Sequence, residues 1–174
     1  MYNGKQQVPG GMTLRAEVIK AESGYKATFV RKFVQGQEEV WAMLTENPKL
    51  QQWFSELTIE DLRKGGNIKF NMGNGKYENM AILDYKEGQK LAFEWGEDQV
   101  HFELTPDHGG TRLELVETIS KIVPHTAKDL AGWHVCLDVI EALLEGTEIA
   151  REEEWNKEYP EYQRLLESMS VSFE

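Results

Sequence analysis

Residues 100–117 read VHFELTPDHGGTRLELVE, and this stretch decides the fold. On both sides of the segment DHGG at 107–110, apolar residues alternate with polar ones, a period typical of β-strands that bury one face. The two glycines can adopt positive φ, so the segment predicts a short hairpin turn. We therefore expect two antiparallel strands in which Phe102 lies opposite Leu115.

A helical pattern follows in residues 126–146, TAKDLAGWHVCLDVIEALLEG. Thr126 predicts the start of this helix and Gly146 its end. Apolar residues recur at alternating intervals of three and four, which places them on one helical face. These residues are Leu130, Trp133, Leu137, Ile140 and Leu144. A strongly alternating hairpin that leads into a long amphipathic helix suggests a helix gripped by a curved sheet.

The preceding part of the chain predicts two short helices and a run of strands. Residues 37–54 contain two apolar faces at helical spacing, separated by Asn47 and Pro48. Asparagine is a favoured N-cap and proline is favoured at the first helical position, so Asn47 is expected to cap the second helix. From 57 to 120, glycine-containing turns separate short alternating segments, which predicts an antiparallel meander.

Two neighbouring strands of this meander have a register that depends on the turn between them. If residues 97–98 form a two-residue turn, Trp95 lies opposite Val100. The same register places Glu94 beside His101 on the other face. These two side chains could form an acid–base couple, but a surface cross-strand pair is the simpler interpretation.

Composition excludes several functions. The 174 residues fit one domain that can bury a sizeable core, and the formal net charge of −11 opposes nonspecific binding to nucleic acid or anionic membrane. No segment is long and apolar enough to span a bilayer, and no signal peptide is recognisable, so we expect a cytoplasmic protein without membrane insertion. The single cysteine, Cys136, lies on the apolar helix face and is expected to be a buried thiol.

Four segments occur in order along the chain: VWAMLTENPKLQQWF, KLAFEW, VHFELTPDHGGTRLELVE and GWHVCLDVIEALLEG. Together they resemble the activator of Hsp90 ATPase homologue 1-like family of the START/Bet v 1-like SRPBCC superfamily. The resemblance implies an α+β helix-grip fold: a curved antiparallel sheet of about six to seven strands around a long C-terminal helix, with two short helices after the first strand. The expected organisation is a disordered N-terminus at 1–12, the family domain at 13–146 and a helical C-terminal extension at 147–174.

The resemblance also implies a cavity between sheet and helix, because members of the superfamily fold around one and many bind lipids, sterols or polyketides. The candidate ligand-binding residues are Trp41, Trp53, Phe54, Phe70, Met72, Tyr77, Tyr85, Phe93, Trp95, Phe102, Leu115, Glu117, Trp133, Leu137 and Ile140. Glu117 stands where many relatives carry a histidine. An inward Glu117 could accept a hydrogen bond from a ligand hydroxyl, but an exposed carboxylate at the strand end is the simpler interpretation.

Catalytic and metal sites find little support in the sequence. His134 and Asp138 have the i, i+4 spacing of a helical metal pair, but no third ligand stands at a matching place, so we expect solvated polar residues and no metal. No G-x-S-x-G, P-loop, dinucleotide-binding, H-E-x-x-H or paired-cysteine motif is present. We therefore predict no catalytic residue and no cofactor.

The leading hypothesis is a non-enzymatic protein that binds a small hydrophobic ligand, lipid-like or aromatic, in a stress-related setting. An alternative is a protein-interaction module that modulates the ATPase of the chaperone Hsp90, as the family name implies. A second alternative is a cyclase- or aromatase-like enzyme, for which Glu117 is the only candidate group. The expected partners are thus a small hydrophobic ligand or a chaperone, and no nucleic acid.

Overall fold

The structure is a computed structural model that describes residues 14–171. The chain divides into two compact units, one up to Ile119 and one from Ser120 onward. The disorder predicted for residues 1–12 lies outside the described residues.

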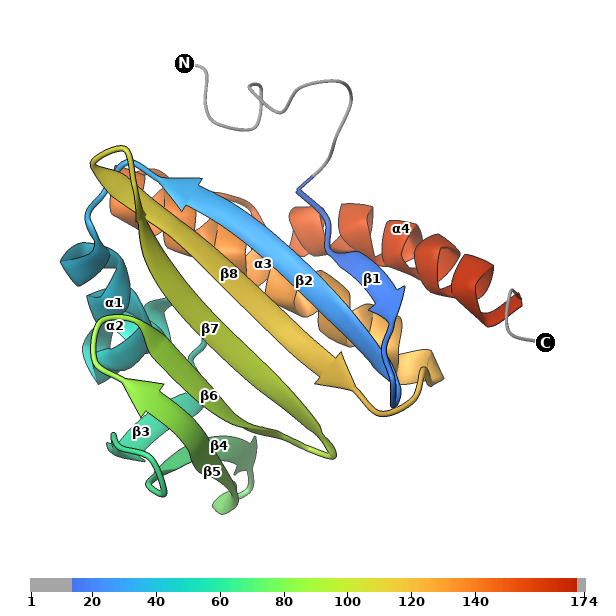
Figure 1. Ribbon diagram of the computed structural model, residues 1–174, viewed down its shortest axis with the longest axis horizontal. Coiled ribbons are helices and arrows are strands. Elements are labelled where there is room, and N and C mark those ends of the chain that lie inside the picture. Colours follow the sequence, from blue (N-terminus) through green and yellow to red (C-terminus); the bar gives the residue numbers. More distant parts are fainter. Residues whose placement is uncertain (1–13, 172–174) are drawn as a thin grey trace. The chain divides into compact units, whose positions relative to one another are not determined.

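An open antiparallel sheet of eight strands forms the first unit, in the order β1-β2-β8-β7-β6-β5-β4-β3 (Figure 1). The strands are β1 (Glu17–Lys20), β2 (Tyr25–Phe33), β3 (Leu57–Asp61), β4 (Asn67–Gly73), β5 (Lys76–Lys86), β6 (Lys90–Trp95), β7 (Asp98–Asp107) and β8 (Gly110–Ile119). The number of strands slightly exceeds the six to seven that were predicted. The long strand β5 pairs with β4 and with β6, and its register shifts between Ile82 and Asp84.

Two short helices, α1 (Gln37–Thr45) and α2 (Asn47–Trp53), connect β2 to β3, as predicted. The cap of α2 differs from the prediction, because Glu46 is the N-cap and Asn47 is the first helical residue. The indole Nε1 of Trp53, at the end of α2, donates a hydrogen bond to the carbonyl of Met43 in α1 at 2.8 Å. This buried bond ties the two helices together.

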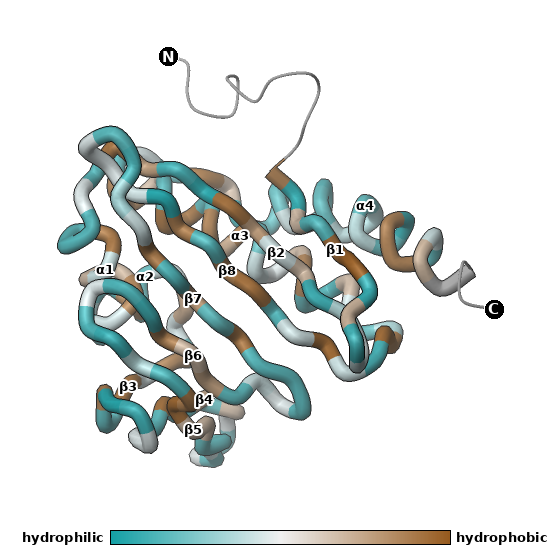
Figure 2. The backbone as a smooth tube through the Cα atoms, viewed as in Figure 1, coloured by the Kyte–Doolittle hydropathy of each residue, from teal (hydrophilic) through white to brown (hydrophobic). Residues whose placement is uncertain are grey.

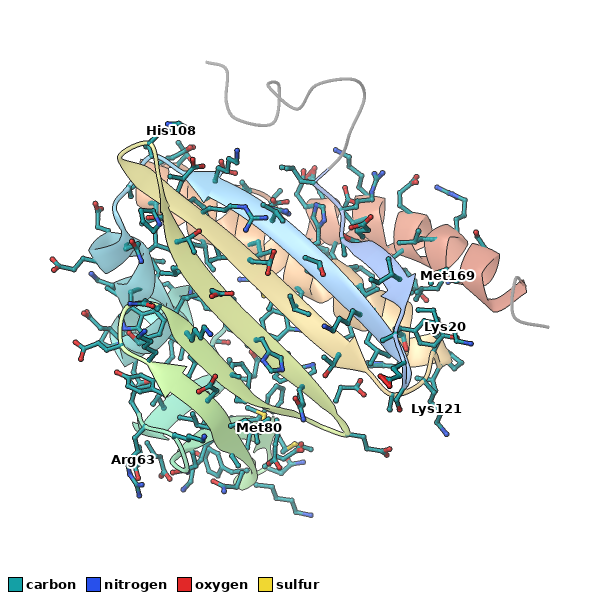
Figure 3. All side chains as sticks on the ribbon, in the orientation of Figure 1. Lys20, Arg63, Met80, His108, Lys121 and Met169 are labelled. Atoms are coloured by element: carbon teal, nitrogen blue, oxygen red, sulfur yellow. The ribbon has the colours of Figure 1, made fainter. Side chains whose placement is uncertain are left out.

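The hairpin β7–β8 has the predicted register, with Phe102 opposite Leu115. His108 lies at its tip (Figure 3). Apolar and polar residues alternate along both strands, as the change of colour in Figure 2 shows. From Val100 to Leu104 and from Thr111 to Ile119, every second residue is buried and the residues between them are half-buried or exposed, so one face of this hairpin belongs to the core.

The register of β6 and β7 corrects the prediction. Trp95 lies opposite Asp98, not opposite Val100, because the turn consists of Gly96 and Glu97. Gly96 has a φ of 63°, which suits the first position of a two-residue hairpin turn. The error amounts to two residues, and a shift by two keeps every side chain on its own face.

The second unit is a pair of helices, α3 (Pro124–Glu145) and α4 (Arg151–Val171), which pack on each other. Helix α3 ends at Gly146 in the left-handed conformation, as predicted, but it begins two residues earlier than expected. The hydroxyl of Thr126 accepts a hydrogen bond from the backbone N–H of Val123, the N-cap residue, at 2.9 Å. Thr126 therefore stabilises the start of α3 from a position within its first turn. Helix α4 continues through Pro160. No helix in residues 14–171 is long and apolar enough to cross a membrane.

Candidate functional site

Six aromatic side chains of the first unit form a continuous network of ring contacts, which we call the aromatic cluster. The members are Trp53 and Phe54 at the end of α2, Phe70 of β4, Phe93 and Trp95 of β6, and Phe102 of β7. All six are among the candidate ligand-binding residues predicted from the sequence. The sheet and α2 therefore bring together residues that lie up to 49 positions apart.

A triangle of three rings lies at one side of the aromatic cluster. The ring centroids of Phe54 and Phe70 are 6.0 Å apart, and each lies 5.7 Å from the centroid of Trp95. All three pairs meet edge to face, an arrangement in which the positive edge of one ring contacts the negative face of the next. Phe93 links this triangle to Phe102, with centroid distances of 6.2 Å to Trp95 and 6.4 Å to Phe102.

The aromatic cluster has a buried side and a half-buried side. Trp53, Phe93 and Phe102 are at most 3% exposed. The three rings of the triangle, Phe54, Phe70 and Trp95, are half-buried. Large aromatic rings that stay accessible beside a closed core offer apolar surface to a further molecule.

The other candidate residues of the first unit lie in three different environments. Met72 and Tyr77, near the turn between β4 and β5, are 58% and 57% exposed. Trp41 of α1 is buried and packs on half-buried Tyr85 of β5, with ring centroids 6.1 Å apart. Burial raises the pKa of the Tyr85 phenol, and the nearby carboxylate of Glu87 raises this pKa further. None of these four side chains has a ring contact with the aromatic cluster among those described.

Glu117 is buried, which corrects the preferred interpretation of an exposed carboxylate. Only 1% of the residue is exposed, and in the sheet it lies between Ala27 of β2 and Val100 of β7. Val100 in turn lies opposite Phe93 of the aromatic cluster. The carboxylate shares a face with buried apolar residues because cross-strand neighbours point to the same side.

Arg31 is a second buried charged residue of this sheet, and its burial was not predicted from the sequence. It is 3% exposed, and its Nη1 donates to the carbonyl of Leu14 at 2.7 Å. The alternation along β2 could have predicted this burial, because Arg31 lies on the same face of the strand as the buried residues Phe29 and Phe33.

In the second unit, the candidate residues Trp133, Leu137 and Ile140 are all buried, at 2% exposure or less. His134 and Asp138, predicted to be solvated, are each 5% exposed. The prediction was wrong because helix α4 packs on α3 and places its own polar groups beside His134.

The buried histidine lies among hydrogen-bonding and charged groups from both helices. Its Nδ1 lies 2.9 Å from the hydroxyl of Tyr162, and its Nε2 lies 3.5 Å from Asp138 Oδ2 and 3.8 Å from Glu158 Oε2. Among the described residues, no group of three or more His, Cys, Asp or Glu side chains is arranged to hold a metal ion. We refer to His134, Asp138, Glu158 and Tyr162 as the histidine cluster.

Glu94 and His101 are not the direct cross-strand neighbours that the sequence predicted. The observed register pairs Glu94 with Gln99 and His101 with Ala92. Glu94 Oε1 accepts a hydrogen bond from the backbone N–H of Ala81 at 2.9 Å, and His101 Nε2 lies 3.1 Å from Gln99 Oε1. Desolvation lowers the pKa of the His101 imidazole, although Asp84 opposes this effect.

Solved structures that are similar to this chain along most of its length define the class of fold. The conserved protein of unknown function EF2215 from Enterococcus faecalis is 25% identical, with a TM-score of 0.79 over 88% of this chain and 91% of its own. CalU16 from Micromonospora echinospora is 21% identical, with a TM-score of 0.68 over 87% of this chain and 94% of its own. A protein of Bordetella parapertussis, encoded by gene BPP1335, is 21% identical, with a TM-score of 0.66 over 88% of both chains. The fold is the predicted α+β helix-grip class of Bet v 1-like proteins.

The model of the family described as activator of Hsp90 ATPase homolog 1-like protein matches residues 36–145. The match spans 110 of the 174 residues, and the chain belongs to this family. No curated protein matches the sequence. In general terms, family and fold support a ligand-binding or Hsp90-ATPase-activator-like domain.

Proposed function

We propose that the protein binds a small hydrophobic molecule with an aromatic or lipid-like body against the half-buried side of the aromatic cluster. The observation that carries this proposal is the partial exposure of Phe54, Phe70 and Trp95 beside three buried rings. Covering apolar surface contributes about 25 cal/mol per Å² before the entropic costs of binding. A pre-packed group of rings loses little side-chain freedom when a ligand covers it, which favours binding.

Glu117 is the polar group that we propose to orient the ligand. It lies two strands away from Phe93, with Val100 between them, and the spacing of strands in a sheet makes this separation about 10 Å. A ligand with an apolar body on the aromatic cluster and a hydroxyl or amine donor at that distance would fit both groups. Burying such a donor against a carboxylate is favourable only if the hydrogen bond forms, so Glu117 would discriminate against ligands that lack it.

A titration with a library of lipids and polyphenols tests the proposal, with amide shifts as the readout. We expect saturable shifts at Phe54, Phe70 and Trp95. Trp95→Ala should weaken binding by roughly tenfold, because an aromatic contact contributes about 0.5–1.5 kcal/mol beyond the area it buries. The matched control is Trp155→Ala in α4, where the half-buried indole stacks on Tyr159 at 4.8 Å and should leave the affinity unchanged.

The same titration separates the role of the aromatic cluster from the role of Glu117. For a ligand with a donor, Glu117→Gln should reduce affinity, whereas for its analogue without the donor the affinity should change little. Shifts that stay linear with ligand concentration, or equal losses in Trp95→Ala and Trp155→Ala, would contradict a site at the aromatic cluster.

A second candidate function is modulation of a chaperone ATPase, favoured by the description of the family whose model matches residues 36–145. Its test is the ATP turnover of Hsp90 from the same cell with and without the protein. A turnover that changes with a saturable dependence on the protein supports this function, and an unchanged turnover at excess protein argues against it.

A further inference from the structure

Strand β3 ends the sheet on one side, as the last strand in its order. A terminal strand has backbone N–H and C=O groups that no further strand of the sheet can bond. Such an edge can pair with a strand of another molecule, and natural sheets protect their edges against this. The sequence of β3, LTIED, contains two residues with strong strand preference, Thr58 and Ile59.

The side chain of Asn47, the first residue of α2, occupies both outward groups of Ile59. Its Oδ1 accepts a hydrogen bond from the Ile59 N–H at 2.8 Å, and its Nδ2 donates to the Ile59 carbonyl at 2.9 Å. In an antiparallel pair, one residue makes these same two bonds with its partner through the backbone. The amide of Asn47 therefore takes the place of a residue in a neighbouring strand.

One turn further along α2, Gln51 covers the next outward position of the edge. Its Nε2 donates to the carbonyl of Leu57 at 3.0 Å and to the hydroxyl of Thr58 at 2.9 Å. The N–H of Leu57 donates to the carbonyl of Phe54 at 3.2 Å, just after α2. The two outward residues of β3, Leu57 and Ile59, thus have all four of their backbone groups bonded to α2 or to the residue that follows it.

The side chain of Asn47 bonds to strand β3 and does not cap α2 as predicted. No side chain caps the N-terminus of α2, where Glu46 is the N-cap. An asparagine next to a helix start ordinarily satisfies the free N–H groups of the first turn. Here both ends of its amide are committed to Ile59.

We infer that Asn47 and Gln51, which we call the amide clasp, close the β3 edge against a second copy of this chain. Antiparallel pairing of two β3 strands about Ile59 is symmetric and places Ile59 opposite its own copy. This pairing uses the same outward backbone groups of Leu57 and Ile59 that the amide clasp occupies. A contact that repeats the same surface on both partners closes as a two-fold dimer.

The test compares Asn47→Ala/Gln51→Ala with the wild type and with Gln52→Ala. Gln52 lies on the same helix and is exposed, so its replacement is matched in chemistry and leaves the amide clasp intact. Molar mass is measured by light scattering after gel filtration, from micromolar to near-millimolar protein, with circular dichroism as a control for folding. We expect the mass of the double variant to double with rising concentration, while wild type and Gln52→Ala keep one mass.

A folded double variant whose mass equals that of the wild type at every concentration overturns the inference, even if it is less stable. If the double variant does not fold, the single variant at the exposed Gln51 provides the test. Gln51→Ala frees the carbonyl of Leu57 and the hydroxyl of Thr58, and should raise the molar mass above that of Gln52→Ala at the highest concentration. Equal masses for these two single variants would refute the closing role of the amide clasp.

Discussion

The imidazole Nδ1 of His134 in α3 lies 2.9 Å from the hydroxyl of Tyr162 in α4, and this hydrogen bond is buried. Tyr162 has no exposed surface, and the ring centroids of the two residues are 5.8 Å apart in an edge arrangement. A polar contact of this kind fixes one alignment of the two helices, because sliding either helix would leave buried polar groups without their partners.

Tyr162→Phe tests the worth of this hydrogen bond. The phenyl ring retains the packing and only the hydroxyl is lost, so we expect the free energy of unfolding to fall by about 1–3 kcal/mol. The control is Tyr159→Phe, because the Tyr159 hydroxyl bonds only in an exposed position, to Gln163 Nε2 at 3.0 Å, and should change stability by less than about 0.5 kcal/mol. Urea unfolding measures both variants. Equal losses would mean that the buried bond contributes no more than the exposed one.

His101 should make the protein less stable in acid. Burial lowers the pKa of its imidazole in the folded state below the ordinary value of 6.5, so the unfolded chain binds the proton more tightly. The stability that depends on the neutral ring is therefore complete above pH 6.5 and is lost as the pH falls below it. His101→Gln should make the free energy of unfolding depend less on pH between neutrality and the onset of acid unfolding.

The control for this pH dependence is His108→Gln, at a side chain that is 96% exposed at the tip of the β7–β8 hairpin (Figure 3). This variant should reproduce the pH profile of the wild type in the same urea titrations. A profile that flattens as much in His108→Gln as in His101→Gln would assign the effect to general charge and not to the burial of His101.

Two glycines should respond to the same substitution with opposite signs. A Cβ atom at Gly110 would lie 2.1 Å from the carbonyl oxygen of Phe33, a distance that requires the backbone of one strand to move. Gly110→Ala should therefore lower the free energy of unfolding by about 1–3 kcal/mol. Gly132, inside α3, has no atom within 4 Å of such a Cβ, so Gly132→Ala should raise stability by about 0.5–1 kcal/mol. Thermal unfolding of both variants checks the signs, and a stabilised Gly110→Ala would contradict the crowding at that position.

Local patterns in the sequence sufficed for much of the fold. The pairing of Phe102 with Leu115 followed from one tight turn, because the turn fixes the register of both strands. The register of Trp95 was wrong by two residues, since the sequence offers two overlapping dipeptides as the turn and periodicity does not choose between them. The error does not change which rings share a face of the sheet, because a shift by two residues leaves each ring on the same face.

Long-range packing accounts for the features that the sequence did not predict. His134 and Asp138 have the spacing of a polar helix face, and only the packing of α4 on α3 makes them buried. Asn47 has the residue type and the sequence position of a helix cap, and only the neighbouring edge strand explains why its side-chain amide bonds to Ile59. In both cases the partner lies in another element, which a pattern within one segment cannot identify.

The strand order has a consequence for how the sheet folds. Gly110 pairs with Asp107 across a two-residue turn, whereas Phe29 pairs with Leu115 across 85 residues of intervening chain. Closing a long loop costs entropy before its contacts form, and non-local pairing slows folding. We therefore expect the hairpins from β3 to β8 to form first and the β1–β2 hairpin to join β8 last. Pulsed hydrogen exchange during refolding should find the amides of β7 protected earlier than those of β2.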